Sequence, residues 1–129
     1  MHTVSMRSDE LCPCGSGDQF GSCCLPMHVS ERQAQTAEQL MRSRYSAYVV
    51  GDGNYVWRTW HPRTRPPEIT DFTVTWTRLE IVDCVDGERG DSAGEVEFRA
   101  YHRAGVLHER SRFAVRGGRW FYLDGEIFD

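Results

Sequence analysis

The feature that most restricts how this chain can fold is a group of four cysteines within "CPCGSGDQFGSCC", residues 12–24. The whole chain of 129 residues holds only five cysteines. Residues 1–30 are rich in Cys, Gly and Ser and have little periodic apolar pattern, so this segment cannot build a hydrophobic core and needs a cross-link. A disulfide framework, a redox pair and a metal site are the competing interpretations.

The spacing favours a metal site. Adjacent cysteines, Cys23 and Cys24, cannot bond each other without strain, and a redox pair would prefer C-x-x-C, which the sequence lacks. Cys12 and Cys14 can turn toward one ion, and the glycine-rich stretch after them lets the chain return for the second pair. Four thiolates in tetrahedral geometry fit zinc, and iron is also compatible with sulfur ligands. His28 is an alternative fourth ligand in place of Cys24.

Composition indicates the cellular compartment and the classes of partner to expect. No run of eighteen apolar residues and no secretory signal pattern is present, so we expect a cytoplasmic protein without a transmembrane segment, whose thiols stay reduced. The formal charge is −4, all fifteen basic residues are arginine, and no basic tail occurs, so nucleic acid is not an expected partner. The composition changes near residue 30, which predicts an amino-terminal module (residues 1–30) and a second domain (residues 31–129).

The second domain begins with helical patterns and ends with strands. Thr36 and Gln39 form a capping-box pattern before an amphipathic stretch that ends at Gly51, and Asp52 is placed to cap a second short helix. From residue 72 the apolar period becomes two, which predicts a meander of four strands within 73–87, 93–105, 106–118 and 119–128. The expected class is therefore α+β, with helices on one face of an antiparallel sheet. Cys84 is expected to be a small buried apolar residue.

The third strand places a carboxylate among apolar residues, since every second side chain lies on the same face: Leu107, Glu109, Ser111 and Phe113. Arg44 interrupts the apolar stripe of the first helix in the same way. One hypothesis is a buried Arg44–Glu109 pair that fixes the helix against the sheet, for which no nucleophile or cofactor motif is needed. The other is a pocket with Glu109 and His61 as general acid and base. The candidate pocket residues are Arg44, Tyr45, Trp60, His61, Glu109, Ser111, Trp120 and Tyr122.

Two resemblances extend this interpretation. The stretch "CPCGSGDQFGSCCLP" resembles the SEC-C zinc motif, which implies that Cys12, Cys14, Cys23 and Cys24 bind zinc and that the module contacts a protein partner. The stretches "LMRSRYSAYVVGD", "RTWHP", "GEVEFRAYHR" and "HERSRFAVRGGRWFYLDG" resemble the YchJ-like family. That resemblance implies a nuclear-transport-factor-two-like (NTF2-like, cystatin-like) cone, in which a curved sheet wraps a long helix and leaves a pocket.

The sequence therefore predicts a zinc module that mediates protein–protein interaction, fused to a cone-shaped domain without evident catalytic apparatus. The alternative is an enzyme or small-molecule-binding protein that uses the cone pocket, because this fold hosts both kinds of protein. The arginine-rich outer face of the third strand is expected to be solvated or to form a homodimer through the sheet.

Overall fold

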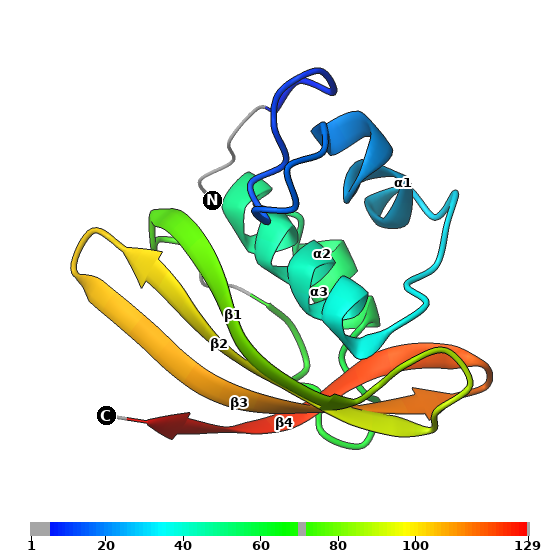
Figure 1. The fold of residues 1–129 in the computed structure, drawn as a ribbon. Helices are drawn as coiled ribbons and strands as arrows, with labels where there is room; N and C mark the ends of the chain where they lie inside the picture. The colour runs from blue at the N-terminus through cyan, green and yellow to red at the C-terminus, as the bar shows by residue number, and fades with distance from the viewer. Residues whose placement is uncertain (1–5, 70–71, 129) are drawn as a thin grey trace.

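The computed structural model describes residues 6–69 and 72–128 and shows an α+β arrangement of short helices over a curved four-stranded sheet (Figure 1). The helical elements are a 3-10 turn η1 (Phe20–Ser22), α1 (Leu25–His28), α2 (Ala37–Val50) and α3 (Gly53–Arg58). The strands are β1 (Trp76–Asp86), β2 (Ala93–His102), β3 (Gly105–Arg116) and β4 (Arg119–Phe128). They pair antiparallel in the order β1-β2-β3-β4, which confirms the predicted meander. No helix in the described part of the chain is both long and apolar enough to cross a membrane.

The predicted helix ends are confirmed. The Thr36 side chain accepts a hydrogen bond from the Gln39 amide, so one of the unpaired N–H groups at the start of α2 is satisfied. Gly51 takes a left-handed conformation (φ 79°) at the other end, as a helix C-cap favours. Asp52 caps α3 by accepting from the Tyr55 amide. These local signals set the position of α2, the central helix of the molecule.

The core lies between α2 and the concave face of the sheet. Leu40, Met41 and Tyr45 of α2 pack against Phe98 and Phe113 of the sheet, all of them buried. The expected amphipathic pattern of α2 is only partly confirmed, because Ser43 and Ser46 are fully buried as well. The physical reason is that α2 lies between the sheet and the amino-terminal module, so several of its faces are covered (Figure 1).

The outer face of the sheet is a network of opposite charges. Arg110 of β3 forms ion pairs with Asp83, Glu95 and Glu97 from the two preceding strands. His108 also contacts Glu97, at 2.6 Å. Because these arginine charges are paired within the chain, the face is not a continuous basic surface. Dimerisation through this face stays a prediction.

The prediction that Cys84 is buried is wrong. It lies exposed on β1, with its sulfur 3.5 Å from a carboxylate oxygen of Glu38 on α2. Its register partner on β2 is the fully buried Val96, so Cys84 faces the α2 side of the sheet. It stays exposed because it lines a polar groove between β1 and the start of α2, which no described side chain of the core fills.

Candidate metal centre and sheet cavity

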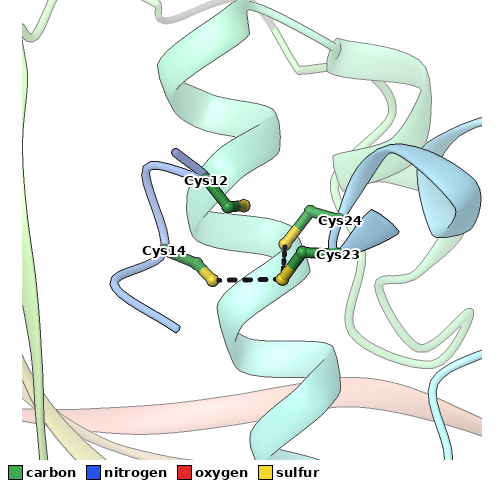
Figure 2. Close-up of side chains that lie close together, drawn as sticks. All are labelled: Cys12, Cys14, Cys23 and Cys24. Carbon is green, nitrogen blue, oxygen red and sulfur yellow. Dashed lines mark hydrogen bonds between the residues drawn. The ribbon is translucent and has the colours of Figure 1, made fainter. Parts of the chain in front are cut away.

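The four clustered cysteines converge on one point. Residues 11 and 19 form an isolated antiparallel bridge, and the Cys12 amide donates to the Asp18 carbonyl at 2.8 Å, so the loop closes on itself. This closure brings Cys12 and Cys14 opposite Cys23 and Cys24, which lie at the start of α1, and Figure 2 shows all four side chains pointing toward a common centre. Their sulfur atoms all lie within 4.8 Å of one another. This arrangement could hold a metal ion.

The sulfur spacing agrees with tetrahedral coordination. The Cys14 sulfur is 3.6 Å from that of Cys23, which is 3.9 Å from that of Cys24. Zinc–sulfur bonds of about 2.3 Å in a tetrahedron place sulfur atoms about 3.8 Å apart. Cys12, Cys14 and Cys24 are buried and Cys23 is half-buried, so the protein itself supplies four ligands in a nearly closed shell.

The electrostatics of the cluster also call for a cation. Hydrogen bonds from the Cys12 and Cys24 thiols hold the pKa of Cys14 well below its usual value. The same contacts with Cys12 and Cys14 raise the pKa of Cys24, and burial raises the pKa of Cys23 to about 11. These opposite directions show that neighbouring sulfurs oppose one another's ionisation, and a cation between them would offset that repulsion.

Helix α2 supports the cluster with two polar side chains. The Ser46 hydroxyl, fully buried, lies 3.5 Å from the Cys12 sulfur. Arg42 donates from Nη1 to the Cys14 carbonyl at 2.6 Å and pairs with Glu38 one turn earlier. Hydrogen bonds of this kind orient metal ligands and offset thiolate charge. Neither supporting residue was predicted from the sequence. The signal that could have found them is the spacing of four between polar positions 42 and 46 on α2.

His28 does not take part in the cluster. Its ring is buried, its Nε2 lies 2.8 Å from the Ser43 carbonyl, and it packs at 4.7 Å between ring centroids against Tyr55. Burial lowers the pKa of His28. This histidine therefore packs the module against α2 and α3, and the alternative of His28 as fourth ligand is not supported by the geometry.

A cavity of about 420 Å³ lies on the other side of α2, between the helix and the sheet. Six of the eight candidate pocket residues line it: Arg44, Tyr45, Trp60, Glu109, Ser111 and Tyr122. Lining residues that the sequence analysis did not name include Met41, Tyr48, Trp76 and Phe98. Positions 41, 44, 45 and 48 recur at helical spacing on one face of α2, and this pattern could have predicted which α2 residues line the cavity.

The remaining two candidates lie elsewhere. The amide of His61 donates to the Tyr122 carbonyl at 2.7 Å, because residues 59–61 pair alongside β4, and its ring lies against Phe121 instead of the cavity. Trp120 is buried in the core and donates to the Gln35 carbonyl at 3.2 Å. His61 and Glu109 therefore do not converge as an acid and base.

The prediction of an Arg44–Glu109 ion pair is also wrong. No ion pair joins these two side chains among the described residues. Glu109 accepts hydrogen bonds from the hydroxyls of Ser111 (2.7 Å) and Tyr122 (3.0 Å). Arg44 donates to the Val56 carbonyl and the Thr59 hydroxyl, both at 2.8 Å. Each charged group thus has local hydrogen-bond partners, and the side chain of Tyr122 lies against both.

Comparison with known proteins gives matches over both parts of the chain. A family model described as "YchJ, middle NTF2-like domain" matches residues 36–125, and the SEC-C motif matches residues 10–26. A UPF0225 protein of Streptomyces coelicolor is 51% identical over 92% of this chain and 96% of its own length. A UPF0225 protein of Deinococcus radiodurans is 49% identical over 88% of this chain and 86% of its own length.

Two solved structures share the fold. The solution structure of a SEC-C motif containing protein from Rhodopseudomonas palustris has a TM-score of 0.78 and 35% identity, covering 92% of this chain and 98% of the other. The crystal structure of a SEC-C motif containing protein from Psychrobacter arcticus has a TM-score of 0.75 and 27% identity, with coverages of 95% and 85%. Both resemblances found in the sequence are confirmed by these matches.

Proposed function

The chain belongs to the YchJ family of proteins with an NTF2-like domain and a SEC-C motif, and from this premise we propose that its cysteine cluster binds one structural zinc ion and that the module thus stabilised contacts a protein partner in the cytoplasm. The observation that carries the proposal is the closed shell of four sulfur ligands, three of them buried. Structural zinc sites are closed in this way, whereas catalytic sites keep one position open for water or substrate. The reducing cytoplasm keeps the thiols available for the metal.

A polar groove beside the cluster is the surface that we assign to the partner. This groove of about 550 Å³ runs between the module, α2 and the β1–β2 turn, and the half-buried Cys23 is part of its wall. Its charged residues are Asp18, Arg32, Glu38, Arg42, Asp86, Glu88 and Arg89. Since both signs are present, a partner segment with mixed charge fits this groove better than a uniformly anionic nucleic acid or lipid surface does.

The metal part of the proposal is tested by elemental analysis of the full chain purified without added metal. We expect one zinc ion per chain, lost when Cys14 and Cys23 are both replaced by serine. One iron ion per chain would support the structural metal site but would show that its metal is iron and not zinc, because sulfur ligands also suit iron. Less than a stoichiometric amount of either metal would contradict the metal site.

The partner part is tested by site-specific photo-crosslinking in cells. A crosslinking residue at position 89 lies in the groove, and one at Arg103 in the exposed β2–β3 turn is the matched control. We expect a defined protein adduct from position 89 that disappears in the Cys14→Ser, Cys23→Ser double variant, whose groove wall is no longer held by metal. Equal adducts from both positions, or an adduct that survives the double variant, would contradict a metal-dependent partner site.

A further inference from the structure

The cavity under α2 contains a buried cation with hydrogen-bond donors that no described residue uses. Arg44 is only 5% exposed, and burial lowers the pKa of its guanidinium. Both of its side-chain hydrogen bonds in the described part of the chain come from Nη1, so Nε and Nη2 have no partner there. No fully buried polar side-chain atom among the described residues lacks a partner, so these two nitrogen atoms are reached from the cavity that Arg44 lines.

The aromatic walls hold this guanidinium in place without neutralising it. Its carbon atom lies 4.7 Å from the ring centroid of Tyr122 and 5.2 Å from that of Trp60. Cation–π contacts stabilise a cation but leave its N–H edge free for an acceptor. An unpaired buried charge is costly, and a carboxylate of a ligand would offset that cost by accepting from Nε and Nη2.

The carboxylates of the cavity restrict what such a ligand can be. Glu109 lines the same space and accepts from Ser111 and Tyr122, and Glu68 stands at the exposed rim. Among the described residues the lining therefore carries one cation and two carboxylates, so a ligand with an anionic group alone would be repelled by Glu109. A ligand that also carries an ammonium group matches both signs, because an ammonium donates to Glu109 while the carboxylate accepts from Arg44.

The rest of the lining is apolar and largely aromatic, with Tyr45, Trp76 and Phe98 among its members. A cavity of about 420 Å³ lies within the range of small-molecule sites, which are mostly apolar with a few converging polar groups. We propose that this cavity binds a small zwitterion of the amino-acid class with an aromatic or branched apolar body, its carboxylate held by Arg44 and its ammonium by Glu109.

The test is an amide NMR titration of the full zinc-loaded chain with three probes that share one body. Phenylalanine carries both charged groups, 3-phenylpropanoate only the carboxylate, and 2-phenylethylamine only the ammonium. We expect phenylalanine to shift amides around residues 41–48 and 107–111 in a saturable way and to bind at least tenfold more tightly than either other probe. Equal affinity for all three probes, or no saturable shift with millimolar phenylalanine, would overturn the proposal.

Two variants assign the roles of the charged residues. Arg44→Met should remove the advantage of phenylalanine over 2-phenylethylamine, and Glu109→Gln should remove its advantage over 3-phenylpropanoate. Should Arg44→Met fail to fold, Glu109→Gln still decides, because the amide side chain keeps an acceptor for Ser111 and Tyr122 but loses the charge that selects the ammonium. Unchanged probe preference in Glu109→Gln would overturn the assignment.

Discussion

At the scale of single residues, the two buried charged groups of the helix–sheet cavity, Arg44 and Glu109, are held by neutral partners in the described part of the chain. The Glu109 carboxylate rests on two hydroxyls, and the Arg44 guanidinium rests on a carbonyl, a hydroxyl and two aromatic rings. Gly125 on β4 leaves room for this arrangement, because a Cβ atom there would overlap the Glu109 carboxylate. Strand alternation identified Glu109, and helical spacing identified Arg44, as facing the helix–sheet interface. It could not decide their pairing, since the pairing depends on the path of the side chains and the space beside Gly125.

The stability of a Glu109→Gln variant distinguishes a Glu109 held by hydroxyl groups from a Glu109 that is ion-paired with Arg44. The amide oxygen of glutamine can still accept from Ser111 and Tyr122, so we expect the free energy of unfolding to fall by about 1 kcal/mol. Loss of one partner from a buried ion pair would instead cost about 3–5 kcal/mol. Chemical denaturation measures the difference, with Glu126→Gln on the exposed part of β4 as the control. A loss in the larger range would mean that Glu109 does neutralise Arg44 in solution.

At the scale of elements, the sequence predicted the helices and strands well because their signals are local. Thr36, Gly51 and Asp52 mark helix ends by their own hydrogen bonds and dihedral angles, and the period of two marks the strands. The cysteine cluster was equally predictable, since its spacing alone carries the chemistry. His61 and Trp120 were misplaced because their positions depend on how residues 59–64 run beside β4 and how residues 33–36 pass over the core, which are long-range contacts.

One such contact joins the β1–β2 turn to the start of α2, and it can be tested with two glycines. Gly87 and Gly90 both have positive φ (77° and 89°), but only Gly87 is packed, because a Cβ atom there would overlap that of Ala37. We expect Gly90→Ala to lower the free energy of unfolding by about 1 kcal/mol, the cost of the left-handed conformation. Gly87→Ala should cost a further ~1–3 kcal/mol from overpacking. Equal losses in chemical denaturation would show that the turn is not docked on α2.

At the scale of the whole molecule, α2 connects the two sites. Its residues 38, 42 and 46, spaced by four, support the cysteine cluster and the polar groove, whereas 41, 44, 45 and 48 line the sheet cavity. The module is also attached directly, since Arg58 of α3 donates to the His28 carbonyl at 2.8 Å and Arg32 to that of Cys23 at 2.8 Å. The division into residues 1–30 and 31–129 stays a prediction about independent stability, because the two parts share contacts along the helix.

Metal removal tests that division. Among the described residues, the core between α2 and the sheet contains none of the module, whereas the module's own buried cluster consists of three cysteines and Phe20. A segment with so small a core depends on its metal for folding, because metal-binding free energy is then folding free energy. We therefore expect a chelator to collapse the amide signals of residues 6–30, to shift those near Arg42 and Ser46, and to leave the dispersion of β1–β4 intact, with recovery when zinc is returned. Loss of dispersion across the sheet would show that both parts fold as one unit, and unchanged module signals in a chain proven free of metal would show that the cysteine cluster needs no ion.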